Sequence, residues 1–318
     1  MTVPGDTEPT DWPVGIYGVW YRDADIPAIL SNPYVTGLSI GVGWKVVQPT
    51  KTSFDWSVID KKLALAQSYG KPVILRVNAG AMTPAWVLAE VPYLTFTTEY
   101  LYGWGIPSAN VPVVWHWKYL SYWKAFITQF AARYGSNPSV VAIQTAGCGH
   151  QGEMSLPNDV PKWVAAGYTD AKLIRAWGAV LTKFRSAFPS KLIVLNIGHP
   201  FYPAKTWPTN VMQPVVDIAL SLTPRAGLQS NALSANTSPG GPFTKVLDAA
   251  APMTTVGYQM IGDAPTAASL RTAFENALFD GAGLSRGIDY VEVYGKDIVD
   301  PLNQDALRFL ASGGQSAP

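Results

Sequence analysis

Short apolar, β-branched runs alternate with longer amphipathic segments from near residue 14 to the end of this 318-residue chain. Each of eight such runs is followed by a segment with helix signals, which is the pattern of repeated βα units. The predicted strands are Val14 to Tyr21, Val35 to Trp44, Pro72 to Asn78, Val140 to Thr145, Leu192 to Ile197, Gly227 to Leu233, Thr255 to Met260 and Tyr290 to Tyr294. Eight such units predict one α/β domain, a (β/α)8 TIM barrel.

The barrel is expected to occupy residues 1–318, with 1–13 as an N-terminal extension and 312–318 as a flexible tail. Helix boundaries agree with this arrangement: Thr169 precedes one predicted helix, and Thr266 precedes another. Two Rossmann-like domains are the rival architecture. They would need a Gly-x-Gly-x-x-Gly turn after an early strand, and the sequence has none there.

Charged residues make up only 14% of the chain, and 23 basic residues face 22 acidic ones. This balance leaves no basic patch for a phosphate backbone, so we expect no nucleic-acid partner. No run of 18 apolar residues predicts a membrane span. Many aromatic residues among few charges suit a neutral, polyhydroxylated ligand, which predicts an oligo- or polysaccharide substrate. We expect a secreted or extracytoplasmic protein whose signal peptide lies outside the given sequence, since the first residues do not resemble one.

The longest insertion, Ala81 to Val114, follows the third predicted strand and is rich in aromatic residues. Loops that follow barrel strands lie on the catalytic face. Its aromatic side chains would either form platforms for the apolar faces of sugar rings or pack as a lid over hydrophobic surface. Those residues are Trp86, Tyr93, Tyr100, Tyr102 and Trp104.

Two glutamates are candidate catalytic residues. Glu153 follows a glycine-rich turn after the fourth strand, where the backbone can fold tightly. Glu292 lies within the apolar run Tyr290 to Tyr294, and strand alternation puts it on one face with both tyrosines. If that face is the lumen, Glu292 is a functional candidate; if it faces the helices, the flanking valines lie inside instead. A pair of carboxyl groups at one barrel end is the equipment for glycoside hydrolysis, whereas an exposed or arginine-paired glutamate is the structural alternative.

Polar and aromatic residues at the other strand ends are the candidates for substrate binding. They are Trp44, Asn78, Trp86, Gln144, His150, Asn196, His199, Asn231, Tyr258, Gln259 and Tyr294. The three histidines lack the spacing of barrel metal sites, so we expect no metal, and no cofactor motif appears. Cys148 has no adjacent base in the sequence and is interpreted as a small wall residue.

The segment Gly43 to Pro49, the run Phe54-Asp55-Trp56, the stretch Gly70 to Leu75 and the run Thr83 to Trp86 resemble clan A glycoside hydrolases. The similarity is greatest to the β-galactosidase-like family 42 over residues 35–90, and it is architectural beyond. The resemblance implies a general acid/base glutamate at the end of the fourth strand. Glu153 matches this position, with Gly152-Glu153 in place of the family's Asn-Glu pair.

The resemblance also implies a nucleophilic glutamate at the end of the seventh strand, where this chain has Tyr258-Gln259. Three explanations stay open: the strand count is wrong by one, Glu292 is the second carboxylate of a divergent site, or Gln259 replaces the nucleophile, natively or by substitution. An alternative function is a non-catalytic carbohydrate-binding barrel. If Glu153 and Glu292 form the pair, they lie on opposite strands, which favours inversion over the retention typical of the clan.

Overall fold

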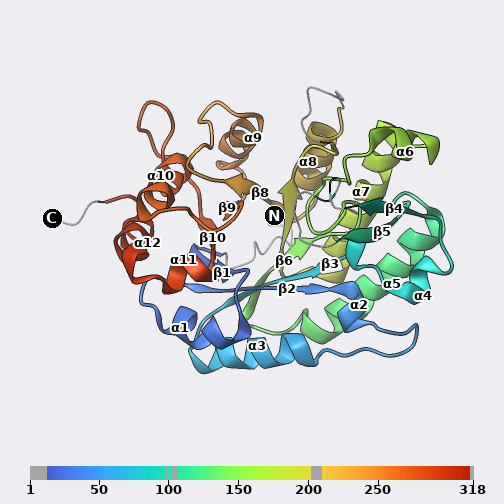
Figure 1. Cartoon of the computed structure of the whole chain (residues 1–318), viewed down its shortest axis with the longest axis horizontal. Coiled ribbons are helices and arrows are strands. Elements are labelled where there is room, and N and C mark those ends of the chain that lie inside the picture. Colours follow the sequence, from blue (N-terminus) through green and yellow to red (C-terminus); the bar gives the residue numbers. More distant parts are fainter. Residues whose placement is uncertain (1–12, 98, 100, 102–106, 202–209, 316–318) are drawn as a thin grey trace, which may run out of the picture.

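Eight parallel strands close into a barrel in the computed structural model, which describes residues 13–97, 99, 101, 107–201 and 210–315 (Figure 1). The barrel order is β1-β2-β3-β6-β7-β8-β9-β10, so neighbours in the barrel follow one another along the chain. Their bounds are β1 Gly15–Val19, β2 Gly37–Gly43, β3 Val73–Asn78, β6 Val140–Thr145, β7 Leu192–Ile197, β8 Gly227–Leu233, β9 Val256–Met260 and β10 Tyr290–Tyr294. The predicted TIM barrel is therefore confirmed, and each predicted strand is present.

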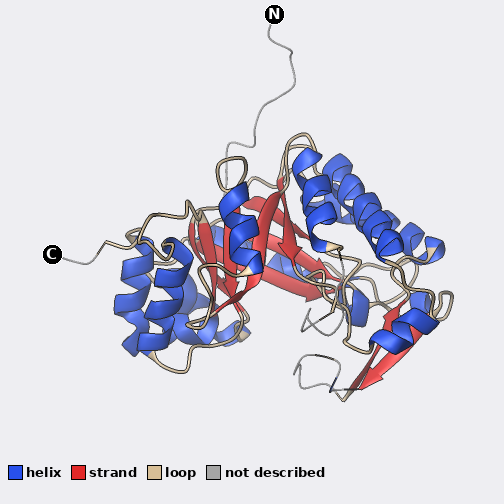
Figure 2. Cartoon of the chain, turned by 90° about the horizontal axis from the view of Figure 1, so that it is seen from above, coloured by secondary structure: helices blue, strands red, loops and turns tan. Residues whose placement is uncertain are grey.

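Helices surround these strands (Figure 2). Their bounds are α1 Ile26–Ser31, α2 Trp44–Val47, α3 Ser57–Ser68, α4 Ala85–Leu88, α5 Trp117–Tyr134, α6 Val160–Ala165, α7 Asp170–Ala187, α8 Met212–Ser221, α9 Pro242–Ala250, α10 Ala267–Leu278, α11 Gly295–Val299 and α12 Gln304–Ala311. The hydroxyl of Thr169 accepts a hydrogen bond from the Lys172 amide, and that of Thr266 accepts one from the Ser269 amide. These side chains cap α7 and α10 because they satisfy amides that lack helical partners.

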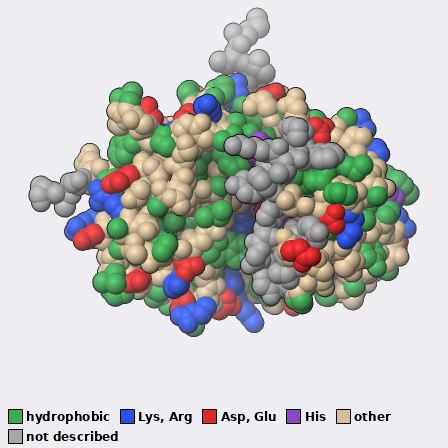
Figure 3. Space-filling model, turned by 45° about the horizontal axis from the view of Figure 1, so that its top comes forward, with side chains coloured by type: hydrophobic (Ala, Val, Ile, Leu, Met, Phe, Trp, Pro, Cys, Tyr) green, Lys and Arg blue, Asp and Glu red, His purple; other side chains and the backbone are tan. Residues whose placement is uncertain are grey.

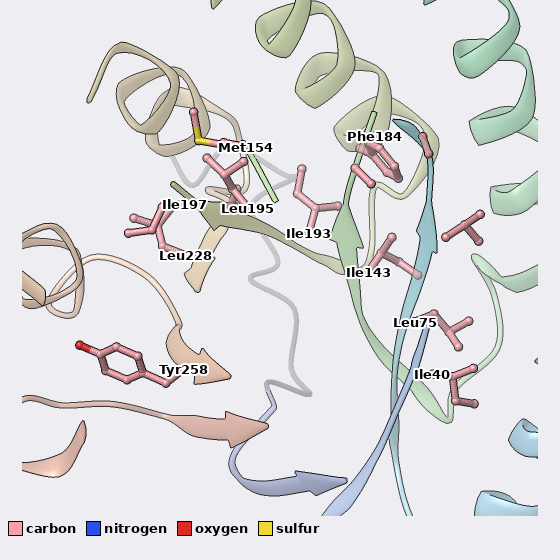
Figure 4. Packing of buried hydrophobic residues seen from close by; sticks show 14 of the residues in the cluster. Ile40, Leu75, Ile143, Met154, Phe184, Ile193, Leu195, Ile197, Leu228 and Tyr258 are labelled. Carbon is pink, nitrogen blue, oxygen red and sulfur yellow. The ribbon is translucent and has the colours of Figure 1, made fainter. Parts of the chain in front are cut away.

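Strand alternation divides the core into two parts. Side chains on the outer face of the barrel pack against the helices, as Ile40, Leu75 and Ile143 do (Figure 4). Inward-facing side chains near the amino-terminal ends of the strands form a smaller apolar cluster. That cluster contains Tyr17, Ile74, Val141, Ala142, Leu192, Val194 and Tyr290.

The rings of Tyr17 and Tyr290 meet edge to face inside the barrel, with centroids 6.0 Å apart. Gly37 lies against the first ring and Gly257 against the second. A Cβ on Gly257 would stand 2.4 Å from the Tyr290 ring, so glycine provides the space that this large side chain needs. The inner cluster closes the lumen below the level at which polar side chains begin.

The insertion after β3 contains α4 and an antiparallel hairpin, with β4 at Tyr93–Thr97 and β5 at Ser108–Pro112. Phe96 is buried and stacks on Trp163 of α6, with ring centroids 5.2 Å apart. The hairpin is thereby anchored to the barrel, and the predicted aromatic-rich insertion after the third strand is confirmed. Tyr100, Tyr102 and Trp104 lie outside the described residues.

The first strand ends two residues earlier than predicted, at Val19 rather than Tyr21. Trp20 has a positive φ of 49°, which a strand residue cannot adopt. Of the described residues other than glycine, it alone has a positive φ. The chain therefore turns at the carboxyl end of β1, and an apolar run that reads as continuous strand does not reveal the turn.

Acidic and basic side chains are interspersed among uncharged ones on the face shown in Figure 3. This distribution agrees with the nearly equal numbers of basic and acidic residues in the chain. None of the helices in the described ranges is long and apolar enough to cross a membrane.

Candidate active site

Five inward-facing polar side chains form a hydrogen-bonded cluster above the apolar layer, which we call the lumen network. Its members are Arg76 of β3, Gln144 of β6, Gln229 of β8, Gln259 of β9 and Glu292 of β10. Several of them stand two residues after a member of the apolar cluster, as Glu292 does after Tyr290, because alternate strand residues share a face. Glu292 therefore faces the lumen, which is the orientation that makes it a functional candidate.

Gln144 is the centre of this network. Its Oε1 accepts a hydrogen bond from Nη1 of Arg76 at 2.9 Å. Its Nε2 donates to Oε1 of Glu292 at 2.7 Å and to Oε1 of Gln229 at 3.0 Å. Nε2 of Gln229 donates in turn to Oε2 of Glu292 at 3.0 Å. One buried amide thus links the cation on β3 to the carboxylate on β10, across the barrel.

Arg76 determines the direction of these bonds because a guanidinium can only donate. The oxygen of Gln144 must face Arg76, so its amide nitrogen faces Glu292. Glu292 accordingly receives a donor on each oxygen, which suits an ionised carboxylate, whose oxygens only accept. The network therefore pairs a positive and a negative group without direct contact, through one glutamine.

Glu292 is fully buried, with 0% of its surface exposed. Burial raises the pKa of its carboxyl group, while the positive charge of Arg76 and the bonds from Gln229 and Gln144 act in the opposite direction. No described carboxylate lies within ion-pairing distance of Arg76, so Glu292 is the charge that balances it through the network. A substrate cannot touch Glu292 unless a member of the network moves.

Glu153 lies in the segment between β6 and α6, on a tightly folded loop of residues 146–155. A Cβ on Gly149 would stand 1.7 Å from the carbonyl oxygen of Glu153. A Cβ on Gly152 would stand 2.7 Å from Cδ of Arg76 and 2.9 Å from Oδ1 of Asn78. The glycines therefore allow the loop to fold onto the lumen network, as the glycine-rich turn predicted.

The carboxylate of Glu153 lies 3.1 Å from Nδ1 of His150, and its side chain is 21% exposed. The same nitrogen lies 3.0 Å from the carbonyl oxygen of Ser155, so the imidazole bridges the two ends of the loop turn. A second anchor is Trp123 of α5, whose indole donates to the Ala146 carbonyl at 2.8 Å. These contacts hold the loop in place and leave the carboxyl group of Glu153 partly exposed.

Besides Gln144 and His150, five other predicted binding residues lie at this end of the barrel in contact with the loop, the network or its surroundings. Asn78 lies against Gly152, and Nδ2 of Asn196 donates to the Gly152 carbonyl at 3.4 Å. Asn231 accepts a 2.7 Å bond from Gln229. The remaining two are Gln259, which accepts a 3.5 Å bond from Arg76, and Tyr294, whose hydroxyl donates to the Ile261 carbonyl.

Burial raises the pKa of Tyr294 to about 12, and the nearby charge of Arg76 partly offsets this effect. His199 is half-buried, its ring packs on Phe243 with centroids 5.3 Å apart, and burial lowers its pKa. Both side chains are thus neutral hydrogen-bonding groups near pH 7.

The structure corrects the prediction that Tyr258 contacts substrate. Tyr258 and Gln259 are consecutive on β9, so only one of them can face the lumen. Gln259 does, and Tyr258 belongs to the outer hydrophobic cluster together with Leu228 (Figure 4). Its hydroxyl lies 3.5 Å from Oγ1 of Thr244 on α9.

The prediction that Trp44 binds substrate is also wrong, because its side chain is fully buried in an aromatic cluster. Its ring lies 4.9 Å from that of Trp123 and 6.1 Å from that of Trp86. The Trp86 indole donates to the Gln48 carbonyl at 3.2 Å, and its ring also packs on Tyr122. Trp44 is therefore a core residue, whereas Trp86 packs against the core and stays partly exposed.

Two residues gain importance that the sequence did not indicate. Arg76 stands at a strand end, but only its contacts reveal it as the cation of the lumen network. Trp20 lies with its ring 5.8 Å from the Arg76 guanidinium carbon. The sequence could have indicated Trp20 by its position just after β1, but the predicted strand continued through Trp20 to Tyr21.

Cys148 is buried, and burial raises the pKa of its thiol, which agrees with a wall residue. Among the residues that the structure describes, no three His, Cys, Asp or Glu side chains gather in a way that could hold a metal ion.

A family model described as beta-galactosidase, glycoside hydrolase family 42, matches residues 8–186 of the chain. The chain belongs to this glycoside hydrolase family. The match covers more than half of the sequence and confirms the resemblance found in residues 35–90. No curated protein sequence matches the chain.

Two solved structures of glycosidases have a fold similar to that of this chain. A β-galactosidase from the psychrophilic Marinomonas ef1 superposes with a TM-score of 0.58 at 12% identity, over 94% of this chain and 59% of that one. The catalytic domain of a β-amylase from Paenibacillus polymyxa superposes with a TM-score of 0.64 at 10% identity, over 98% of this chain and 99% of that one. The chain thus spans 59% of the length of the β-galactosidase and nearly all of the β-amylase domain.

The barrel also excludes one of the three explanations for the missing nucleophile. β9 is the seventh barrel strand, so the strand count is right. Gln259 occupies its inward-facing position, beside Arg76. A divergent pair with Glu292 and a replacement of the nucleophile by Gln259 are the two explanations that remain.

Proposed function

We propose that the protein hydrolyses a neutral, β-linked glycan, with Glu153 as the general acid and Glu292 as the second carboxylate. The observation that carries the proposal is the position of Glu153, a partly exposed carboxyl group held by His150 on a loop that folds onto the lumen network. Its place after the fourth barrel strand is where the family resemblance implies the acid/base.

Glu153 would donate its proton to the glycosidic oxygen as the bond from that oxygen to the anomeric carbon breaks. In the same step a water molecule adds to the anomeric carbon from the opposite face of the ring and passes its proton to the carboxylate of Glu292. Glu292 is enclosed by Gln144 and Gln229, so its carboxylate can reach that water only if Gln144 turns aside. With the network closed, Glu292 acts on the site through the charge and orientation of Arg76.

A neutral substrate is favoured by the charge balance of the lumen, because the negative charge of Glu292 offsets the positive charge of Arg76. The amides of Gln259 and Asn78 add donors and acceptors suited to sugar hydroxyl groups. The β-linkage follows from the family and is part of the proposal.

Inversion at the anomeric carbon is the expected stereochemical outcome. Glu153 follows the fourth barrel strand and Glu292 lies on the eighth, directly across the barrel. We expect this placement to hold the carboxyl groups farther apart than the ~5 Å of retaining enzymes, in the range of ~6.5–9.5 Å that inverting enzymes need. NMR of the first anomer released from a β-glycoside measures this, and a β product would contradict the assignment of Glu292.

The proposal is tested on neutral β-linked oligosaccharides and β-glycosides, with E153Q as the variant. Wild type should release product, and E153Q should lose about 10²- to 10⁴-fold in kcat while binding the same oligosaccharides with similar affinity. E275Q, a conservative change on the outer helix α10, is the matched control and should keep full activity. Full turnover by E153Q would refute the role of Glu153.

A non-catalytic carbohydrate-binding barrel is the second candidate, and Gln259 favours it. This amide stands at the inward-facing position of the seventh barrel strand, where the family resemblance implies a nucleophilic glutamate. Binding of oligosaccharides by wild type without release of any product would support this function and contradict hydrolysis.

A further inference from the structure

The imidazole of His150 faces two oxygen atoms with a single nitrogen. Nδ1 lies 3.0 Å from the carbonyl oxygen of Ser155 and 3.1 Å from Oε1 of Glu153. A carbonyl oxygen can only accept a hydrogen bond, so the network requires Nδ1 to carry a hydrogen. Without that hydrogen, the lone pair of Nδ1 would stand against the carbonyl oxygen. Ser155 thus determines the tautomer of His150, and Glu153 meets a donor at this nitrogen.

The backbone holds His150 in this position on both sides. Its amide donates to the same Ser155 carbonyl at 2.7 Å, and its own carbonyl accepts the Ala81 amide at 2.7 Å. Ala81 belongs to the short 3-10 helix η2, Gly80–Met82, which follows β3. A Cβ on Gly80 would stand 2.3 Å from the His150 carbonyl oxygen, so this close approach requires a glycine. The imidazole is only 3% exposed, and the fold therefore fixes its orientation.

The carboxyl group of Glu153 has two oxygens in different surroundings. Oε1 faces Nδ1 of His150, whereas no hydrogen bond from a described residue holds Oε2. The backbone on either side is fixed: the Gly152 carbonyl accepts the 3.4 Å bond from Asn196, and Met154 is fully buried in the outer hydrophobic cluster (Figure 4). The fold therefore presents the same oxygen to the imidazole and leaves the other without a protein partner among these residues.

This difference decides which oxygen carries the acid proton. If Nδ1 had a lone pair, Glu153 would donate its proton to the imidazole, and a substrate could not receive it. Because Nδ1 carries a hydrogen, a proton on Oε1 would compete with that hydrogen for the same side of the oxygen. A proton on Oε2 leaves Oε1 as a free acceptor for Nδ1. Protonated Glu153 accordingly holds its proton on Oε2.

We propose that His150 is the positioning residue of the general acid, which keeps the proton of Glu153 on Oε2 and directs it to the glycosidic oxygen. The inference rests on the proposed function. In the reaction the proton passes from Oε2 to the glycosidic oxygen, which also takes the electron pair of its breaking bond to the anomeric carbon. Glu153 becomes ionised, so the contact between Nδ1 and Oε1 strengthens. An interaction that strengthens during the reaction raises kcat and leaves KM nearly unchanged.

The test compares substrates that differ in their need for a proton. Neutral β-linked oligosaccharides have a leaving group that must be protonated, whereas dinitrophenyl β-glucoside and β-galactoside release a phenolate that departs without a proton. H150A should lose about 10- to 100-fold in kcat on the oligosaccharides, with KM nearly unchanged. It should keep most of its activity on the dinitrophenyl glycosides. Equal losses on both kinds of substrate would indicate a collapsed loop and would overturn the inference.

H150N and H150Q separate the donor at Nδ1 from the presence of a polar side chain. The amide nitrogen of asparagine can stand near the place of Nδ1, so H150N should keep most of the activity on oligosaccharides. The longer glutamine brings its amide nitrogen near the place of Nε2, so H150Q should lose about as much as H150A. Equal activity of H150N and H150Q would contradict the need for a donor at Nδ1.

H116N is the matched control, because it makes the same exchange at the N-cap of α5, where asparagine is favoured. The ring of His116 packs on Trp117, with centroids 5.9 Å apart, and lies outside the Glu153 loop. H116N should match wild type on both kinds of substrate. A loss in H116N as large as that in H150A would contradict a specific role of His150.

The double variant H150A/E153Q separates this inference from the proposed function. If His150 acts through Glu153, the double variant should be as active on oligosaccharides as E153Q alone. A large further loss would show that His150 acts independently of Glu153 and would overturn the inference. Loss of turnover in E153Q together with full activity of H150A would overturn the inference alone. Full turnover by E153Q would overturn the proposed function itself.

Discussion

The Glu153 loop and strand β10 bring the same residue type to one end of the barrel in opposite environments. Glu153 is partly exposed and is held by one imidazole on a glycine-rich loop. Glu292 is fully enclosed and accepts bonds from Gln144 and Gln229 on rigid strands. A reachable carboxyl group can exchange a proton with a substrate, whereas an enclosed one sets the charge of its surroundings. The comparison predicts that replacing Glu153 lowers activity with little effect on stability, whereas replacing Glu292 lowers both.

Replacing Glu292 should have the largest effect on stability. E292Q leaves the buried Arg76 without its balancing charge and places one amide nitrogen against another. We expect the free energy of unfolding to fall by about 3–5 kcal/mol, measured by urea denaturation. E275Q on α10 should change it by less than ~0.5 kcal/mol, since the Glu275 pair with Arg271 is exposed.

A second change distinguishes charge balance from lost packing. In the double variant R76M/E292Q both charges are absent, so part of the lost stability should return. Strictly additive effects of the two single substitutions would show that Glu292 does not balance Arg76. A fully stable E292Q would remove the contrast between the two carboxylates altogether.

Asp297, on α11 just after β10, tests whether burial of a carboxyl group outside the lumen network also makes stability depend on pH. Burial raises the pKa of this carboxyl group to about 6, although both oxygens accept the Ala264 amide at 3.0 and 3.2 Å. Because the folded state holds the proton more tightly than the unfolded chain, the stabilising contribution is complete below pH ~4 and is lost as the pH rises to about 6.

D297N should therefore match wild type near pH 4 and exceed its stability at pH 7.5, by up to ~3 kcal/mol. Thermal unfolding across this pH range measures the difference. D305N, which alters an exposed residue of α12, is the control and should follow the wild-type profile. A difference between D297N and wild type that does not change with pH would contradict the assignment.

The smallest expected effect concerns the packing of the Glu153 loop on Arg76. A Cβ at residue 152 would stand 2.7 Å from Arg76 Cδ, so G152A should displace the loop and lower kcat/KM about 10- to 100-fold, with a stability loss of about 1–3 kcal/mol. G262A is the matched control, because a Cβ there meets nothing within 4 Å. Equal activity of the two variants would show that the loop position does not matter for Glu153.

The sequence by itself determined the order and positions of the eight strands, because strand period and helix boundaries are local properties. Alternation along Tyr290–Tyr294 was also sufficient to put Glu292 on one face with two tyrosines. The same rule places Gln259 and Tyr258 on opposite faces of β9, which contradicts the prediction that both bind substrate. The glycine pattern before Glu153 correctly indicated a tightly folded loop.

Only the tertiary structure decided which aromatic and polar side chains meet. Trp44 and Trp86 look the same as exposed platforms in the sequence, yet they pack with Trp123 and Tyr122 of α5, which are distant in the chain. Whether a side chain is covered depends on such distant partners. Likewise, the positive φ of Trp20 follows from how its neighbours are held against the barrel. The pairing of Arg76 with Glu292 through Gln144 exists only once the barrel closes, because it joins side chains from opposite strands.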